Sequence, residues 1–172
     1  MSAARSEGRE AEQTRKLWQM VRDIKIAMMT TRDGGVLRSR PMECVQVEDD
    51  DGTLWFFTGA SSPKAAEVAG EHEVCLCFVD RPGQNYVSIS GFASILRDRT
   101  KARELWTEDQ RAWYPRGLDD PELALLKVRA QLAEYWDRPS SAMIAAQGLV
   151  RALADETPDL GENAKLSFEP ST

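Results

Sequence analysis

Two serines and a lysine stand where a helix is expected to begin, in the stretch FFTGASSPKAAEV. Ser62 suits the N-cap of that helix and Pro63 suits its first position. The first turn of a helix carries partial positive charge, so Lys64 is poorly placed there unless an anion lies nearby. Free amides at a helix start bind phosphate, and the hydroxyls of Ser61 and Thr58 can donate to the same ligand. This stretch therefore predicts an anion site.

Two arginines offer a second group of cations. In LRSRPM, Arg38 and Arg40 are one residue apart, so alternation puts both side chains on one face of a strand. Their planar guanidinium groups suit phosphate oxygens. Each group also has a simpler interpretation, with Lys64 a solvated lysine on a capped surface helix and the arginines exposed cations of an edge strand. Strand register, which decides whether the two groups meet, is not readable from the sequence.

Most of the elements that must position these groups are strands. Alternating apolar residues predict three strands joined by hairpins at Asp33-Gly34-Gly35 and Asp50-Asp51-Gly52, because glycine supplies the positive φ of such turns. EVCLCFVD and NYVSISGFASILRD predict a fourth and a fifth strand, with Gly91 marking a bulge or a close backbone approach. The tail has room for one short strand. Apolar spacing and caps predict helices at residues 9–23, 62–70, 100–113 and 140–153.

The segment 123–136 fits two patterns. Leu126, Val128 and Ala130 alternate with polar residues as in a strand, whereas Val128 and Trp136 also belong to a helical stripe. Periodicity alone leaves this alternative open. Hairpin-linked strands with helices between them predict an α+β, mainly β, fold in which about six antiparallel strands close into a barrel. We expect a single domain over 1–172, with a core of about 15–137 and a C-terminal helix and tail over 138–172.

Composition indicates which kinds of binding partner and which cellular compartment to expect. The chain has 172 residues and a formal net charge of −6, which argues against a nucleic-acid partner held by a bulk basic surface. No apolar run approaches the roughly 20 residues of a membrane span, and no secretory signal is visible, so we expect a cytoplasmic protein. Cys44, Cys75 and Cys77 fit a reduced protein, and we expect the CxC pair to be small core residues rather than metal ligands. His72, in a charged loop, is not expected to be catalytic.

Four stretches together resemble a known family: IAMMTTRDGGVLRSRPM, LWFFTGASSPKAAEV, YVSISGFASILRD and EYWD. In order and spacing they are similar to the pyridoxamine 5′-phosphate oxidase-like flavoproteins, and most of all to the bacterial general stress protein branch. The resemblance covers roughly Leu17 to Trp136. It implies a split β-barrel that binds FMN, with FAD as an alternative, at the interface of a homodimer. It also favours a strand at 123–136.

The resemblance further implies a set of cofactor contacts. The phosphate or ribityl chain would meet the basic strand residues and the serine-lysine pair, and the flavin ring would lie beside the strand backbone and the aromatic-threonine pair. Trp136 would approach the flavin, in the same subunit or the partner, or else pack in the core or the dimer interface. The implied cofactor-binding residues are Arg38, Ser39, Arg40, Pro41, Met42, Phe57, Thr58, Ser61, Ser62, Lys64 and Trp136.

The sequence also departs from the true oxidases. Their basic substrate-binding residue on the second strand has no counterpart in Cys44-Val45-Gln46, and Tyr86 stands where they carry a glutamine near the flavin. Their C-terminal substrate-binding segment also has no clear match. The expected function is therefore FMN-dependent electron or hydride transfer with a small-molecule substrate, with NAD(P)H as a candidate donor and catalytic residues unassigned. The alternatives are a non-catalytic flavin store or sensor of the stress response and a structural dimer with an empty cleft.

Overall fold

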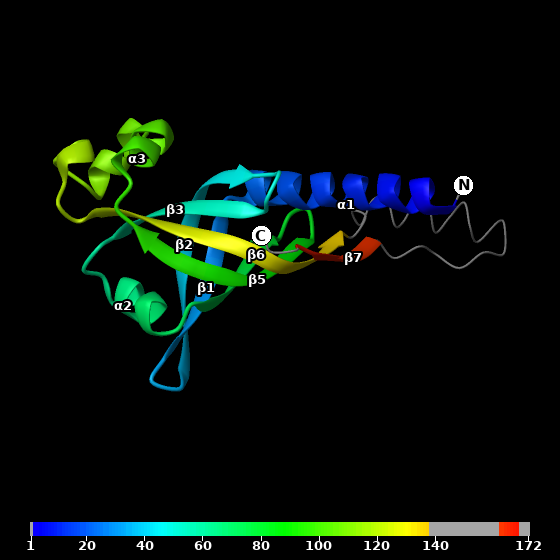
Figure 1. Cartoon of the computed structure of the whole chain (residues 1–172), viewed down its shortest axis with the longest axis horizontal. Coiled ribbons are helices and arrows are strands. Elements are labelled where there is room, and N and C mark those ends of the chain that lie inside the picture. The colour runs from blue at the N-terminus through cyan, green and yellow to red at the C-terminus, as the bar shows by residue number, and fades with distance from the viewer. Residues whose placement is uncertain (1, 138–161, 169–172) are drawn as a thin grey trace.

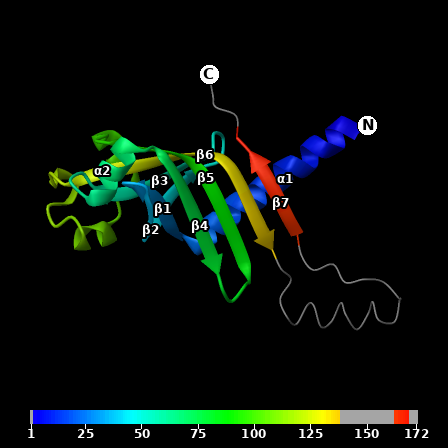
Figure 2. The same cartoon turned by 90° about the horizontal axis from the view of Figure 1, so that it is seen from below.

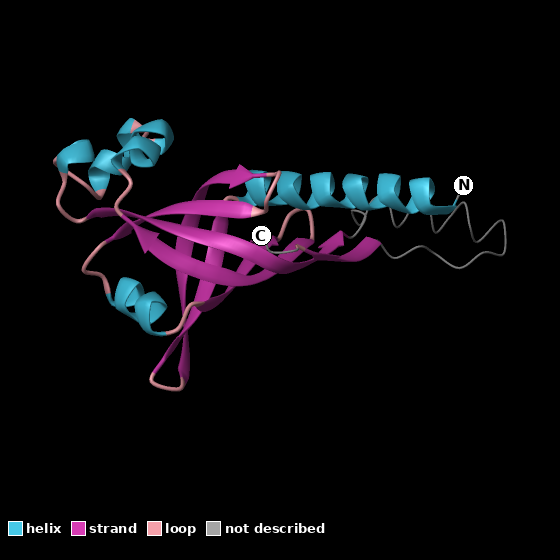
Figure 3. Cartoon of the chain, in the orientation of Figure 1, coloured by secondary structure: helices cyan, strands magenta, loops and turns pink. Residues whose placement is uncertain are grey.

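The described part of the chain, residues 2–137 and 162–168 of a computed structural model, is mainly an antiparallel β-sheet (Figures 1 and 3). Its strands are β1 Ile26–Asp33, β2 Val36–Glu48, β3 Thr53–Gly59, β4 Glu73–Asp80, β5 Asn85–Leu96, β6 Leu123–Asp137 and β7 Glu162–Ser167. Neighbours follow the order β3-β2-β1-β4-β5-β6-β7, and a further pairing of β3 with β6 closes a six-stranded ring. This confirms the predicted α+β, mainly β, split barrel. The predicted tail strand is β7, which continues along β6 beyond β3.

The helices lie around this barrel. They are α1 Ser2–Ile24, α2 Pro63–Gly70, α3 Arg99–Leu105 and the 3₁₀ turns η1 Glu108–Ala112 and η2 Gly117–Asp119. α1 begins earlier than the sequence predicted, and its first half projects past the strands (Figure 1). The single helix expected at 100–113 is wrong, because Trp106 is extended (φ −66°, ψ 132°) and separates α3 from η1. The predicted helix at 140–153 lies outside the described residues.

Strand β6 resolves the ambiguous segment in favour of a strand. It pairs with β5 along one edge and with β3 and β7 along the other. The β5–β6 register shifts between Ser90 and Gly91, which places a bulge in the middle of β6. Residues such as Val128 face the core before the bulge, and Ala133 and Tyr135 face it afterwards. The inward face therefore changes from even-numbered to odd-numbered residues at the bulge, which a strict strand alternation does not predict.

Gly91 occupies a close approach of two backbones, as predicted. A Cβ atom at this position would lie 2.2 Å from the carbonyl oxygen of Arg129 on β6. Backbone atoms cannot move aside as a flexible side chain can. Glycine is therefore required at the bulge by packing, although its φ is not in the left-handed region.

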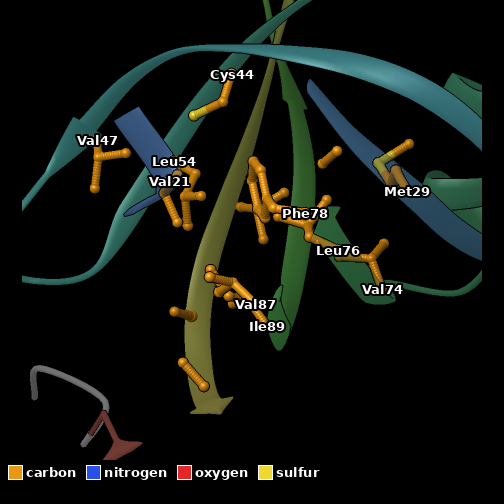
Figure 4. Packing of buried hydrophobic residues seen from close by; sticks show 14 of the residues in the cluster. Val21, Met29, Cys44, Val47, Leu54, Val74, Leu76, Phe78, Val87 and Ile89 are labelled. Carbon is orange, nitrogen blue, oxygen red and sulfur yellow. The ribbon is translucent and has the colours of Figure 1, made fainter. Parts of the chain in front are cut away.

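One apolar core fills the barrel (Figure 4). The inward faces of the strands meet the last turns of α1, whose Leu17, Trp18 and Val21 are fully buried. At the opposite end, α2 contributes Val68 to this core. Figures 1 and 2 show α1 and α2 at opposite ends of the barrel. Neither α1 nor any other helix in the described ranges is both long enough and apolar enough to cross a membrane.

Cys75 and Cys77 are not core residues, contrary to expectation. On β4 it is Val74 and Leu76 that point inward, so alternation turns the two half-buried thiols to the outer face. Their sulfur atoms lie 3.9 Å apart. Within the described ranges, no three metal-ligating side chains are grouped to hold a metal ion. Cys44 does face the core, where burial raises the pKa of its thiol to about 12.

Candidate functional site

The barrel is split where β2 and β3 separate. β2 pairs with β1 from Val36 to Glu43, but its described pairing with β3 runs only from Cys44 to Glu48. Beyond Phe56, the pairing of β3 within the described residues is with β6. A cleft of about 360 Å³ occupies the gap. It is lined by Ile26, Pro41, Met42, Glu43, Val45, Phe57, Thr58, Lys64, Gln110, Trp113 and Tyr114.

The start of α2 supplies the polar end of this cleft. Ser62 is the N-cap residue, with an extended backbone, but its hydroxyl makes no capping hydrogen bond. Instead it lies 3.5 Å from the hydroxyl of Thr58, the last buried residue of β3. Lys64 lies in the first turn and reaches the cleft wall. The prediction that Thr58 lies near Ser62 and Lys64 at the start of α2 is thus confirmed.

Ser61 is arranged differently from its prediction. Its amide lies 3.0 Å from Glu122 Oε2, and its hydroxyl donates to the same oxygen. These two hydrogen bonds lower the pKa of the Glu122 carboxyl. The amide and the hydroxyl of Ser61 therefore both donate to Glu122, in the loop before β6. The hydroxyl is thus not free to donate to a ligand.

Arg38 and Arg40 meet α2 through one carboxylate that the sequence analysis missed. Glu67 is buried, with only 5% of its side chain exposed. Its Oε1 lies 2.9 Å from Arg38 Nη1 and its Oε2 lies 2.5 Å from Arg40 Nη2. Thr31 donates to the same Oε2 at 2.5 Å, and Arg40 donates to Thr31. The two arginines thus share one face of β2, as alternation predicted, and converge on Glu67 of α2, with Arg40 close to Lys64 of the cleft wall.

Lys64 completes a group of three cations. Burial lowers the pKa of Lys64, the charge of Arg40 lowers it further, and Glu67 opposes both effects. Arg38 also pairs with Asp33 at 3.0 Å, out in the exposed hairpin. At the cleft itself, the only carboxylate among the described partners of Arg40 is Glu67. This corner therefore has more positive than negative charge, which favours an anionic ligand.

The remaining predicted residues of β2 and β3 divide between the cleft and the outer surface. Pro41 and Met42 line the cleft on one side, and Phe57 lines it on the other. Ser39 points away from the cleft, and its hydroxyl lies 2.7 Å from that of Thr30 on the outer face. Ser39 is therefore near Arg40 in sequence but does not line the pocket.

The apolar end of the cleft comes from η1 and the residues after it, which the sequence analysis did not select. Phe57 packs edge-on against Trp106, with ring centroids 6.0 Å apart, and lies 6.3 Å from the ring of Tyr114. Trp113 is 80% exposed, although it borders the cleft. Burial raises the pKa of Tyr114 to about 12, so its hydroxyl stays protonated near neutral pH. In the sequence, these residues were indicated only by the cluster of aromatic side chains in WTEDQRAWY.

Trp136 does not reach this cleft. It lies near the end of β6, between Tyr86 of β5 and Asn163 of β7, whereas the cleft borders the beginning of β6. Contact with a flavin of the partner subunit stays a prediction. His72 is also elsewhere, with its Nδ1 2.8 Å from the carbonyl oxygen of Val68.

The closed ring with a cleft between β2 and β3 defines a split β-barrel. A family model described as pyridoxamine 5′-phosphate oxidase like matches residues 12–159. The chain therefore belongs to the pyridoxamine 5′-phosphate oxidase-like family. This confirms the family resemblance drawn from the sequence.

Solved structures give the same fold. A candidate general stress protein 26 from Jannaschia sp. CCS1 is 28% identical, with a TM-score of 0.75, and the match covers 92% of this chain and 99% of that one. The general stress FMN/FAD binding protein of Xanthomonas citri is 30% identical, with a TM-score of 0.68, over 76% of this chain and 92% of that one. Protein bli-3 of Neurospora crassa is 28% identical over 141 residues, 76% of this chain but only 64% of bli-3. The chain thus spans less than two thirds of that relative.

Proposed function

We propose that this protein binds FMN in the cleft between β2 and β3 and uses it for electron or hydride transfer to or from a small molecule. The observation that carries the proposal is the excess of positive charge at the α2 end of a mainly aromatic and apolar cleft, where Lys64 of the wall lies beside Arg40. Such a pocket suits a ligand with a flat apolar body and an anionic end. The similar protein of Xanthomonas citri is named as binding FMN or FAD, which supports a flavin.

The residues present fit FMN at both of its ends. Lys64 and Arg40 would hold the phosphate, aided by the hydroxyl of Ser62, which is not used as a cap. Phe57 offers an aromatic wall for the ring system. FAD carries a phosphate at the same position, so it remains the second candidate.

The chain's own residues act here by binding and orientation. A bound flavin supplies the hydride and electron chemistry. Among the described residues that line the cleft, Glu43 is the one carboxylate, and none forms a nucleophile-base pair. Tyr114 is a protonated hydroxyl at the wall and can donate a hydrogen bond to a ligand. NAD(P)H is the donor that this proposal favours.

Oxidation of pyridoxamine phosphate is not part of the proposal. That substrate carries its own phosphate and needs a second cationic site. At the corresponding part of β2 the cleft is lined by Val45, which is apolar. Lys64 is the only cation among the described lining residues, and it serves the proposed cofactor phosphate.

The working form in this proposal is a homodimer. Ile26, Met28, Val79 and Tyr86 are large apolar residues of the barrel's outer face, each between 39% and 49% exposed. Met28 pairs with Pro41, and Ile26 and Pro41 line the cleft, so this face is continuous with the proposed cofactor site. A second copy on this face would bury it and cover the cleft. Exposed apolar patches of this kind mark interaction sites.

Trp136 provides a test of the dimer. Its position beside Tyr86 puts it at the margin of the same outer face. We expect the wild-type protein to sediment as a dimer and Trp136→Ala to weaken dimerisation or change the fluorescence of bound flavin. If both measurements match those of the wild type, Trp136 belongs neither to the interface nor to the site.

The proposed function is tested by the chromophore itself. Freshly purified protein is denatured, and the released compound is compared with FMN, FAD and riboflavin by chromatography. We expect FMN, and we expect NADH or NADPH to bleach the reconstituted protein until an acceptor is added. Bound flavin that stays oxidised with every donor would support storage or sensing instead, in keeping with the stress-protein names of the relatives. Failure to bind added FMN would end the proposal.

A further inference from the structure

Glu67 is the most enclosed charge beside the proposed cofactor site. It is the fifth of the eight residues of α2, one turn after Lys64, at a buried helix position next to Val68. Carboxylates are rarely buried unless they are paired. Here the pairing is complete, because Glu67 accepts from Arg38, Arg40 and Thr31. Each of these donors is of a type that also binds phosphate oxygens.

The balance of charge explains why a carboxylate is needed there. Without it, the half-buried Lys64 and Arg40 would repel one another, and Arg40 is only 19% exposed. Removing one partner of a buried ion pair leaves an uncompensated charge and is strongly destabilising. A ligand phosphate would provide the same compensation from outside. Glu67 and that phosphate therefore compete for the same cations.

We infer that Glu67 is an internal anion that stands in for the cofactor phosphate, holding the cation cluster together in the ligand-free protein and weakening its affinity for the phosphate. This inference rests on the proposed function. It makes Glu67 a positioning residue that keeps the cofactor exchangeable, at the expense of tighter binding. The competing view is that Glu67 only orients Arg40 and thereby strengthens binding.

The first test uses ligand-free protein and the isosteric variant Glu67→Gln. The matched control is Glu71→Gln, which removes the same charge one turn later, from an exposed pair with Arg32. We expect Glu67→Gln to lower the melting temperature by about 3 °C more than the control. Inorganic phosphate, compared with chloride at equal ionic strength, should restore most of that loss in Glu67→Gln and shift the wild type and control little. No selective rescue by phosphate would overturn the inference.

The second test separates the inference from the proposed function. Titrations with FMN and with riboflavin, which lacks the phosphate, are compared in the wild type and both variants. We expect Glu67→Gln to bind FMN about tenfold more tightly than Glu71→Gln does, because one repelling charge is gone, and riboflavin equally. Weaker or equal FMN binding would overturn the inference and leave the FMN proposal standing. Phosphate rescue without FMN binding in the wild type would support the inference and end the FMN proposal.

Discussion

A central charge with two partners of opposite sign occurs at each half of the β2–β3 pair, partly buried in one half and buried in the other. On the closed half, where the two strands are hydrogen-bonded, Lys101 of α3 lies 2.7 Å from Glu48 and 2.8 Å from Glu104. Its ammonium also lies over the ring of Trp55, 5.2 Å from the centroid. On the open half, the central charge is instead the carboxylate of Glu67 between two arginines.

The two clusters differ in the sign of the central charge, and this difference distinguishes a structural cluster from a candidate binding site. Around Lys101, two carboxylates and an aromatic face satisfy one cation, and the neighbouring parts of β2 and β3 are paired with each other. Around Glu67, one carboxylate serves two arginines while Lys64 stands beside them. Only the second arrangement has an excess of cations, and only there do the strands separate into a cleft. Ion pairs alone therefore do not indicate a binding site. A cluster with more cations than carboxylates beside a cavity does indicate one.

The largest effect that tests this contrast is loss of a cation on the open half. We expect Lys64→Ala and Arg40→Ala each to weaken FMN binding by about 1–3 kcal/mol, the range for charge-assisted hydrogen bonds. Calorimetric or fluorescence titration of ligand-free protein measures it. Unchanged affinity in both variants would refute the assignment of this cluster to the phosphate.

Loss of a cation on the closed half should lower the stability of the fold rather than the affinity for FMN. We expect Lys101→Ala to lower the free energy of unfolding by about 1 kcal/mol, a modest figure because its glutamate partners are partly exposed. FMN affinity should not change. Urea unfolding and FMN titration are measured on the same preparation. A loss of FMN affinity as large as that of Lys64→Ala would remove the distinction between the two clusters.

The pH dependence of binding provides a finer test of the open half. Burial lowers the pKa of Lys64 below its ordinary 10.5, so the ammonium loses its proton earlier than a free lysine as pH rises. We expect FMN affinity to fall on the alkaline side, beginning below that value. Lys64→Arg keeps its charge and should hold its affinity to higher pH. Comparison of the two proteins cancels the titration of FMN itself, and identical profiles would exclude Lys64 as the titrating group.

The smallest expected effect on stability concerns the apolar end of the cleft. Trp113 is 80% exposed, so Trp113→Ala should change the free energy of unfolding by less than about 0.5 kcal/mol. If the ring contacts the flavin, binding weakens by about 1 kcal/mol, the scale of aromatic pairs, and flavin fluorescence changes. Titration and thermal unfolding measure the two quantities. Unaltered binding and fluorescence would limit the site to the strands and α2.

Several features of the fold and site followed from the sequence. The hairpin glycines, the N-cap at Ser62 and the alternation of Arg38 with Arg40 are local features, and the structure places each of them as expected. Glu67 was not predicted, because a glutamate in a helix is usually solvated. Its role depends on two arginines of another strand, and no local pattern shows that contact.

Long-range packing also decided the features that differed from expectation. The bulge opposite Gly91 changes which residues of β6 face inward, and this depends on how β5 pairs with β6. The segment after α3 places Tyr114 with its ring centroid 6.3 Å from that of Phe57, a contact between residues far apart in the sequence. Ser61 is directed to Glu122, far along the chain, rather than outward.

The sequence by itself determined strands β1 to β5, the start of α2 and the family, because alternation, caps and turn glycines act between neighbouring residues. Tertiary structure alone decided where β2 leaves β3, and hence that the cations border a cleft with one buried carboxylate among them. The physical reason is that electrostatic balance and cavity shape depend on distances between separate elements. Those distances exist only when the ring has closed.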